Sequence, residues 1–257
     1  MNKHGDFIWY ELMTSDVEAA IPFYGAVLNW TAEKFDNAPG GYWVFSRDGA
    51  GVAGGLALPA EAVAGGARPG WIGYVGVDDV DATVKEILAA GGAEHMPATD
   101  IPGVGCMAML SDPQGAFFYV MRGSSGEDSA AFDQAKPGHG NWNELHTSDP
   151  KAGLNFYAAR FGWAQARVVD MGPIGDYRII GHGGREIGGV MKAQPGGPPA
   201  TWCFYFGVED IHATAEAIRA NGGSVMQGPA EVPGGAYTLI AADPQGAVLG
   251  FVGPGKG

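Results

Sequence analysis

Three residues near the middle of the chain have types and a spacing that suit proton transfer. Trp142, Glu144 and His146 stand at every second position, so on a β-strand their side chains share one face. A glutamate and a histidine side by side can share a proton and act as base and acid. Burial raises the pKa of a carboxyl group, which is how a general base is tuned. We therefore take Glu144 and His146 as candidate catalytic residues.

The first strand-like segment of the chain carries the same pattern with one change. Trp9, Glu11 and Met13 alternate in the same way, and Glu11 is a further candidate catalytic carboxylate. Met13 stands where the other segment has its histidine, and a thioether cannot exchange a proton. If only one segment performs chemistry, we expect it to be the one that carries the histidine.

Each of these residues also has a purely structural interpretation. The two glutamates could be held by backbone amides or by a tyrosine, and the histidine could be a hydrogen-bonded interior residue. A divalent metal bound by Glu144 and His146 is a third alternative, although two protein ligands make a weak site. These interpretations remain open from the residues alone.

Both segments belong to a long internal repeat. The run FIWYELMTSDVEAAIPFYGAVLNW at 7–30 recurs as GNWNELHTSDPKAGLNFYAARFGW at 140–163, and DPQG at 112–115 recurs at 243–246. A repeat of about 130 residues is too long for a solenoid, whose units span roughly 20 to 50 residues, and it has the size of a domain. The chain therefore contains two copies of one domain.

Composition narrows the classes of partner. The chain has 257 residues, 46% of them hydrophobic, and a net charge of −13. An acidic surface repels phosphate backbones and anionic lipids, which argues against nucleic-acid and membrane partners. Cys106 and Cys203 are not at equivalent positions and form no CxxC motif, so neither a disulfide nor a zinc site is predicted. With no signal-like or membrane-spanning stretch, we expect a cytoplasmic monomer or homodimer.

Each copy divides again into two runs of strand, helix and strands. The residue pattern predicts strands at Phe7–Met13, Tyr42–Arg47, Gly51–Leu58, Trp71–Val77, Cys106–Leu110 and Phe117–Met121. It predicts helices at Val17–Leu28, Asp79–Ala90, Asp149–Phe161 and Asp210–Ala220, with Asp as the capping residue. Pro22 is expected to kink the first helix or to shift its start. The pair Gly91-Gly92 is expected to end the second helix in a left-handed turn.

In this order the motifs resemble a known family. SDVEAAIPFYGAVLNW and SDPKAGLNFYAARFGW, followed by VDDVDATVKEILAAGGA and VEDIHATAEAIRANGGS and closed by SDPQGAFFYV and ADPQGAVLGF, are similar to the vicinal oxygen chelate superfamily, the glyoxalase/bleomycin-resistance/dioxygenase group. The resemblance implies an α+β fold of four βαβββ units. These would form two cup-shaped, eight-stranded mixed sheets with helices on the outer face. It also implies glyoxalase-like domains at residues 5–122 and 139–254, joined by a linker at 123–138.

The resemblance also places the candidate residues relative to the cup. In metal-binding relatives the first ligand is a histidine seven residues before the capping Asp, a position held here by Trp9 and Trp142. Glu11, Met13, Glu144 and His146 would then line the concave face. The other ligand positions fall on Ile72 and Cys203, on Gly54-Gly55 and Gly188-Gly189, and on Tyr119 and Gly250. Since these cannot supply the usual donors, we expect no cofactor, and dioxygenase chemistry, which needs two histidines and a carboxylate, is disfavoured.

Two functions follow as hypotheses. The first is an enzyme of lyase, isomerase or hydrolase type that moves a proton on a small oxygenated or aromatic molecule in the second cup. The second is a non-catalytic protein that sequesters a small molecule or antibiotic, as bleomycin-resistance members of the family do. Several side chains would give the cups walls for a planar ligand, although core packing explains such residues equally well. These candidate substrate-binding residues are Trp9, Met13, Phe117, Tyr119 and Trp142.

Overall fold

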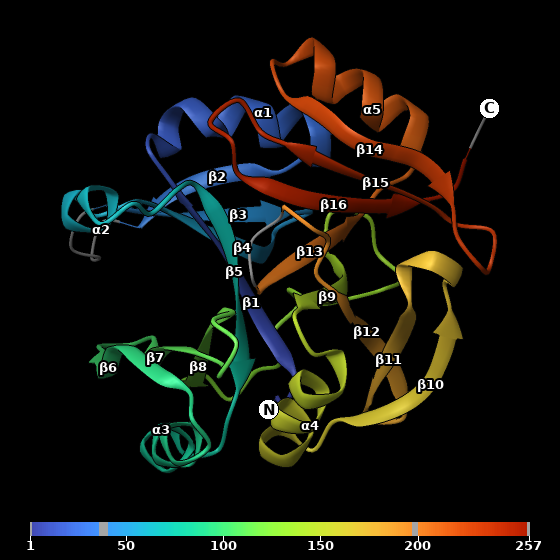
Figure 1. Ribbon diagram of the computed structural model, residues 1–257. Coiled ribbons are helices and arrows are strands. Elements are labelled where there is room, and N and C mark those ends of the chain that lie inside the picture. Colours follow the sequence, from blue (N-terminus) through green and yellow to red (C-terminus); the bar gives the residue numbers. More distant parts are fainter. Residues whose placement is uncertain (1, 36–40, 197–199, 256–257) are drawn as a thin grey trace. The chain divides into compact units, whose positions relative to one another are not determined.

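The computed structural model describes residues 2–35, 41–196 and 200–255, and its strands form two eight-stranded mixed sheets, one from each copy (Figure 1). The first sheet has the order β2-β3-β4-β1-β5-β8-β7-β6, and the second has the equivalent order β10-β11-β12-β9-β13-β16-β15-β14. Each copy repeats strand, helix and three strands twice. The predicted α+β fold of four βαβββ units is confirmed.

The strands of the first sheet are β1 (Phe7–Thr14), β2 (Thr31–Phe35), β3 (Tyr42–Arg47), β4 (Ala50–Ala57), β5 (Gly70–Gly76), β6 (Ala93–Ile101), β7 (Gly105–Ser111) and β8 (Phe117–Gly123). Those of the second are β9 (Gly140–Thr147), β10 (Ala164–Asp170), β11 (Asp176–His182), β12 (Arg185–Lys192), β13 (Thr201–Gly207), β14 (Ser224–Glu231), β15 (Tyr237–Ala242) and β16 (Val248–Gly253). The helices are α1 (Val17–Leu28), α2 (Ala60–Ala64), α3 (Val80–Ala89), α4 (Pro150–Phe161) and α5 (Ile211–Ala220), with a 3₁₀ turn η1 (Gly172–Ile174).

The helices begin and end close to where the sequence predicts. The carboxylate of Asp16 accepts from the amide of Ala19 at 3.1 Å, and the corresponding aspartates cap α3, α4 and α5. Such a cap contributes about 1 kcal/mol. Helix α1 begins at Val17 and continues through Pro22, so the proline does not shift its start. Gly91 follows α3 with φ 88°, which confirms the predicted left-handed stop.

The residue pattern missed the strand that follows each of the four long helices, namely β2, β6, β10 and β14. These are the edge strands of the two sheets, and most of their side chains are exposed. A strand without a buried face has no alternation of apolar and polar residues, so periodicity cannot reveal it.

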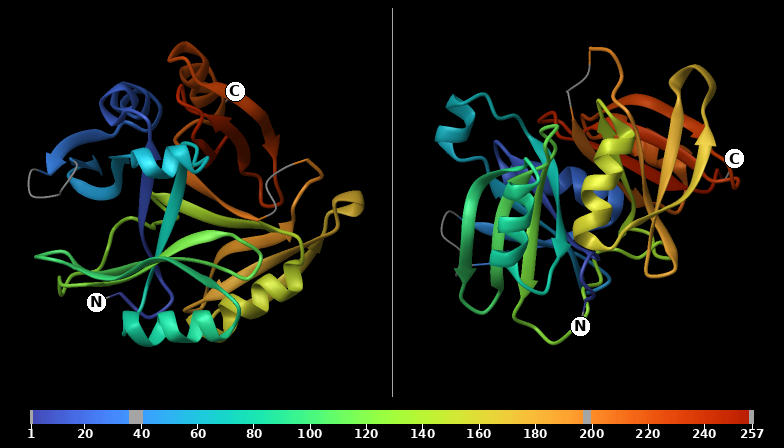
Figure 2. Two further views of the ribbon diagram at one scale, coloured as in Figure 1. Left: turned by 60° about the vertical axis from the view of Figure 1, so that its left-hand side comes forward. Right: turned by 60° about the horizontal axis from the view of Figure 1, so that its bottom comes forward.

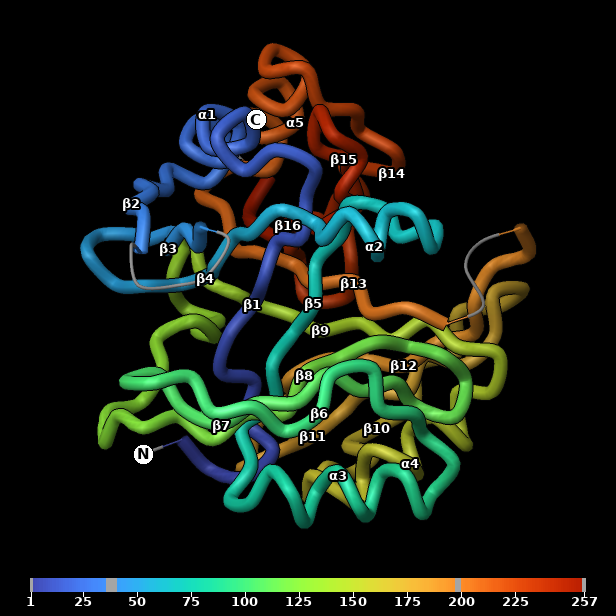
Figure 3. Tube along the Cα trace, turned by 90° about the vertical axis from the view of Figure 1, so that its left-hand side faces the viewer, coloured from blue at the N-terminus to red at the C-terminus, as the bar shows by residue number. Residues whose placement is uncertain are grey.

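The chain forms two compact units, and each unit contains parts of both copies. The first unit comprises residues 1–8, 73–129 and 142–203, and the second comprises residues 9–72, 130–141 and 204–257. In the first unit α3 and α4 lie side by side (Figure 2). In the second unit, α1 and α5 lie side by side. In the first unit, α4 also packs on β10, β11 and β12 (Figure 3). The proposed domain limits at 5–122 and 139–254 stay a prediction.

A buried hydrogen-bond chain ties the two copies together within the second unit. The hydroxyl of Tyr24, on α1, donates to Asp243 Oδ2 at 2.9 Å and accepts from Trp71 Nε1 at 3.2 Å. The other oxygen of Asp243 accepts from the amides of Gln245 and Ala247, both at 2.9 Å. Burial, with the charge of Asp243, raises the pKa of Tyr24 well above its usual value, so the phenol stays a donor.

The first unit contains the same series of buried hydrogen bonds, with the roles of the two copies exchanged. Tyr157, on α4, donates to Asp112 Oδ2 at 3.1 Å and accepts from Trp202 Nε1 at 3.0 Å. Burial raises the pKa of Asp112, and the amides and the phenol that bond to it partly oppose that rise. In both units, therefore, the DPQG turn of one copy is held by a helix of the other.

We predict that Tyr24→Phe and Tyr157→Phe each lower the free energy of unfolding by about 1–3 kcal/mol, because each removes a donor to a buried carboxylate oxygen and an acceptor of an indole N–H. Urea denaturation measures the change. Tyr237→Phe is the matched control, since the described residues offer no hydrogen bond to its hydroxyl. Equal stability of all three variants would contradict a role for the buried chains.

Candidate functional site

Strand β9 presents Glu144 and His146 on the face that is turned away from helix α4. It pairs in parallel with β12, with Glu144 opposite Gly189. The side chains of Leu145 and Thr147 point the other way, because a Cβ added at Gly153 on α4 would lie 3.5 Å and 3.2 Å from them. Alternation then puts the two candidate residues on the face that is turned away from α4.

On that face four side chains of the first unit form one hydrogen-bonded array. Trp142 Nε1 donates to the hydroxyl of Tyr177 at 2.7 Å, and this hydroxyl donates to Glu144 Oε2 at 2.6 Å. The second carboxylate oxygen, Oε1, lies 2.8 Å from His146 Nε2. The array connects β9 with β11 and uses both oxygens of the carboxylate.

The hydrogen bonds fix the protonation of the array. Two donors converge on Glu144, which suits a carboxylate rather than a carboxylic acid. Burial and the neighbouring negative charge raise the pKa of Tyr177 well above its ordinary value, so Tyr177 remains a neutral donor. The same two causes raise the pKa of the buried Cys203 thiol, which therefore stays protonated.

The imidazole is oriented so that one nitrogen remains available. When Nε2–H donates to Glu144, the neutral ring keeps a lone pair on Nδ1. The His146 side chain is 20% exposed and that of Glu144 is 11% exposed, so the histidine is the member of the pair that solvent or a ligand can reach. The carboxylate would stabilise the imidazolium formed when Nδ1 takes a proton.

A glycine makes room for the tyrosine in this array. A Cβ added at Gly189 would overlap the Tyr177 ring, and one at Gly54 would overlap the Tyr42 hydroxyl. Gly54 and Gly189, which stand where relatives have a metal-binding side chain, therefore have a packing role. They let an aromatic ring lie flat over the neighbouring strand.

The second unit contains the corresponding part of the first copy. Trp9 Nε1 donates to the Tyr42 hydroxyl at 2.7 Å, the same distance as in the other copy. Glu11 is buried, and strand β1 pairs it with Gly54 on β4. Met13 takes the place of the histidine. The Trp–Tyr pair and the buried glutamate are thus common to both copies, whereas the imidazole is specific to the second.

The remaining predicted binding residues lie on β8 in the first unit. Tyr119 is buried and stacks on Tyr74 with ring centroids 4.3 Å apart. Phe117 is 44% exposed and contacts the His95 ring at 4.5 Å. Neither residue belongs to the hydrogen-bonded array around Glu144.

The residues at the usual metal positions do not fit a metal ion. Aromatic rings occupy them or cover them: the indole of Trp142 is bonded to Tyr177, Tyr119 stacks on Tyr74, and a Cβ at Gly250 would overlap the Tyr205 ring. Over residues 2–35, 41–196 and 200–255, no three His, Cys, Asp or Glu side chains cluster closely enough to hold an ion. We derive no step through a metal.

Sequence reasoning missed Tyr42 and Tyr177. Both stand at the same spacing before Gly54 and Gly189, and that coincidence was the available signal. Tyr42 follows Trp30 by 12 residues, whereas Tyr177 follows Trp163 by 14, so this part of the repeat falls out of step with the flanking motifs. The sequence allows a tyrosine as the partner of each glutamate but does not show which tyrosine it is.

Comparison with known sequences gives matches over both copies. The sequence model of the Glyoxalase/Bleomycin resistance protein/Dioxygenase superfamily matches residues 7–119 and again residues 140–251. The chain is 35% identical over 256 residues to "Putative glyoxylase CFP32" of Mycobacterium tuberculosis, covering 98% of this chain and 96% of that protein. It is 34% identical over 261 residues to the anthracycline biosynthesis protein DnrV of Streptomyces peucetius, covering 95% and 91%.

Solved structures share the fold. The Mn(II)-bound glyoxalase from Novosphingobium aromaticivorans has a TM-score of 0.65 at 17% identity, covering 98% of this chain and 83% of that one. The 2,2',3-trihydroxybiphenyl 1,2-dioxygenase from Sphingomonas wittichii strain RW1 has a TM-score of 0.68 at 12% identity, covering 99% and 91%. No helix within the described ranges is long and apolar enough to cross a bilayer.

We predict that Tyr24, Tyr157 and Tyr177, three of the nine tyrosines, ionise only at unusually high pH. A pKa that is raised in the folded state adds stability below the ordinary value of about 10, and that stability is lost as the pH rises through the folded value. Ultraviolet titration of tyrosinate, in buffer and in concentrated urea, measures this. Tyr177→Phe should remove one late-ionising phenol, and a folded protein in which all nine ionise normally would contradict the prediction.

We also predict that Gly189→Ala destabilises the protein by about 1–3 kcal/mol, because the new methyl group displaces the Tyr177 ring. Chemical denaturation measures the loss, and indole nitrogen resonances report whether Trp142 keeps its acceptor. Gly126→Ala is the control, since a Cβ there meets no described atom within 4 Å. Unchanged stability in Gly189→Ala would show that the ring is not held in this position.

Proposed function

Because the chain belongs to the Glyoxalase/Bleomycin resistance protein/Dioxygenase superfamily, we propose that it binds a small oxygenated or aromatic molecule and transfers a proton in its second copy. The family expected from the sequence is confirmed by the matches over both copies. The observation that carries the proposal is the array Trp142–Tyr177–Glu144–His146, which holds one imidazole against a buried carboxylate. This is the arrangement of a general base supported by an orienting anion.

The array suggests a division of roles that differs from the simplest expectation. Both oxygens of Glu144 already accept hydrogen bonds, so we assign this residue to positioning and to charge stabilisation. His146 Nδ1 is the atom that would take the proton from the ligand and later return it. A positioned base of this kind contributes roughly 10² to 10⁴-fold to a reaction rate. Glu11, which has no histidine beside it on its strand, would contribute to binding in the first copy.

The names of the relatives indicate the substrate class. A glyoxylase acts on a small carbonyl compound, and an anthracycline biosynthesis protein belongs to the formation of fused aromatic rings. We take a molecule that carries a carbonyl next to an acidic C–H bond as the substrate class for this chain. Such a group would let one positioned base form and quench an enolate, which is a lyase or isomerase type of step. The face of Trp142 would support a planar substrate.

The first copy favours a second function, binding without catalysis. It keeps the Trp9–Tyr42 hydrogen bond at 2.7 Å and a buried Glu11 but has Met13 in place of the base. A site with this composition can hold an aromatic molecule, and it lacks the imidazole to which we assign the proton transfer. The same chain would then combine one binding copy with one catalytic copy, or sequester ligands in both.

We predict that His146→Gln lowers kcat/KM by about 10² to 10⁴-fold and changes ligand Kd by less than about threefold, because the proton acceptor is lost while the walls remain. The assay follows deuterium exchange of the activated C–H by proton NMR. The panel contains methylglyoxal with a thiol and hydroxylated 1-tetralones, which are fused-ring ketones with a C–H bond next to the carbonyl.

Met13→Gln is the matched control in the first copy, and its exchange rate should equal that of the wild type. Glu144→Gln should lower the rate and shift its pH profile, since the neutral amide no longer stabilises the imidazolium. Wild-type exchange rates in His146→Gln would overturn the catalytic proposal. Tight binding with no exchange in any protein would favour the sequestering function.

A further inference from the structure

Each of the two units contains a junction, in which a short segment crosses between two helix ends of that unit. In the first unit the amide of Gly5 donates to Gly76 O at 2.8 Å, and the amide of Gly76 donates to Asp6 O at 2.8 Å. Trp163 Nε1 donates to Gly5 O at 2.8 Å. The crossing segment therefore lies between the end of α4 and the beginning of α3.

The second unit repeats this junction with the copies exchanged. The amide of Gly138 donates to Gly207 O at 2.7 Å, and the amide of Gly207 donates to His139 O at 2.9 Å. Trp30 Nε1 donates to Gly138 O at 2.8 Å. All three hydrogen bonds correspond, so the two junctions can be compared residue by residue. The end of α1 corresponds to the end of α4, and the beginning of α5 corresponds to the beginning of α3.

In the first unit a histidine side chain joins the two helix ends. His4 Nε2 lies 2.6 Å from the carbonyl of Arg160, in the last turn of α4, and its Nδ1 accepts from the amide of Asp78 at 3.3 Å. The imidazole thus donates at one nitrogen and accepts at the other, as the neutral ring does. Its ring also packs near Phe161, with centroids 6.1 Å apart.

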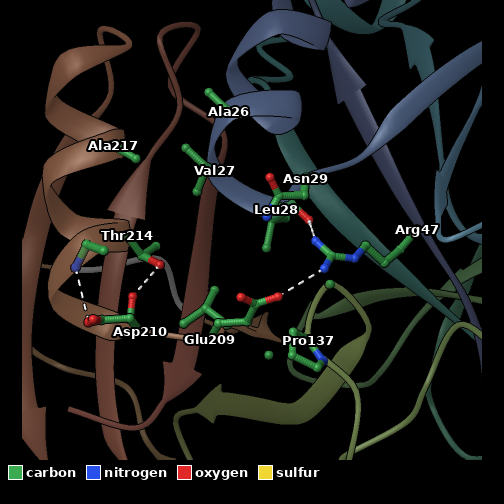
Figure 4. A pocket seen from close by; sticks show the side chains of 14 residues that line it. Ala26, Val27, Leu28, Asn29, Arg47, Pro137, Glu209, Asp210, Thr214 and Ala217 are labelled. Carbon is green, nitrogen blue, oxygen red and sulfur yellow. Dashed lines mark hydrogen bonds and ion pairs between the residues drawn. The ribbon is translucent and has the colours of Figure 1, made fainter. Parts of the chain in front are cut away.

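In the second unit a proline stands at the position of that histidine. Pro137 has no ring donor or acceptor, and it lines a pocket of about 250 Å³ (Figure 4). Val27, which corresponds to Arg160, and Glu209, which corresponds to Asp78, both line the same pocket. Within the described ranges no acceptor bonds the amide of Glu209. The pocket thus has the frame of the other junction without its imidazole.

The walls of the pocket are fixed and small. Arg47 donates to the carbonyl of Leu28 and to Glu209 Oε1, both at 3.1 Å, and its side chain is only 13% exposed (Figure 4). Ala213 and Ala217 line the α5 side. The two hydrogen bonds hold the guanidinium of Arg47 in the wall of the pocket.

We propose that this pocket binds a small nitrogen heterocycle of the imidazole type. One ring nitrogen would donate to the carbonyl of Val27, and the other would accept from the amide of Glu209, as His4 does with Arg160 and Asp78 in the other unit. The volume exceeds that of one five-membered ring, so a short substituent fits as well. The pocket contains neither Glu144 nor His146, and the proposal is independent of the proton-transfer function.

The test is an NMR titration of the ¹⁵N-labelled protein with imidazole. We expect a saturable shift of the Glu209 amide with a Kd of roughly millimolar, as is usual for so small a ligand. N-methylimidazole lacks the ring N–H and should bind about tenfold more weakly, the effect of one lost hydrogen bond. Pyrrole, which lacks the acceptor nitrogen, should leave the Glu209 amide in place.

Two variants make the comparison between the units quantitative. Pro137→His should fill the pocket with the protein's own imidazole and abolish the shift at Glu209. His4→Gly should open the equivalent space in the first unit, so that imidazole also shifts the amide of Asp78. The proposal is overturned if imidazole leaves the Glu209 amide of the wild type unmoved, or if Pro137→His titrates as the wild type does.

Discussion

The structure depends on two buried hydrogen bonds between a tyrosine and an aspartate. Tyr24 reaches Asp243 and Tyr157 reaches Asp112, and in each case a helix of one copy holds the closing turn of the other. A buried carboxylate is costly unless donors surround it, and here two backbone amides and a phenol do so. The arrangement explains why each compact unit contains parts of both copies. It also makes the duplication more than two independent domains in one chain.

On this common frame the two copies differ in single side chains at two corresponding places. The Trp–Tyr hydrogen bond of 2.7 Å and the buried glutamate are present in both, while a histidine in one copy is a methionine in the other. The same holds at the helix junctions, where His4 in one unit is replaced by Pro137 in the other. In both places one copy has an imidazole that the other lacks. A duplicated frame lets such changes occur singly, because the unchanged copy preserves the packing.

The site around Glu144 shows how aromatic residues and glycine replace metal ligands on this fold. A metal would fix a carboxylate by direct coordination, whereas here Tyr177 and His146 fix it by hydrogen bonds. The tyrosine fits only because Gly189 has no side chain. A glycine without a donor side chain at position 189 and the tyrosine ring at position 177 therefore depend on each other. The result is a buried carboxylate that the protein's own side chains hold by hydrogen bonds.

The amino-acid sequence by itself determined the duplication, the helix limits and the face on which Glu144 and His146 lie. These depend on local rules: a capping aspartate, a terminal glycine and the alternation of a strand. Only the tertiary structure decided that Tyr177 would meet Glu144, that Tyr24 would reach Asp243 and that the edge strands would form. Those contacts join residues far apart in the chain, and the loops between them vary in length, so no local pattern specifies them. The pocket beside Pro137 was likewise decided by the tertiary structure, because its walls come from residues that are far apart in the chain.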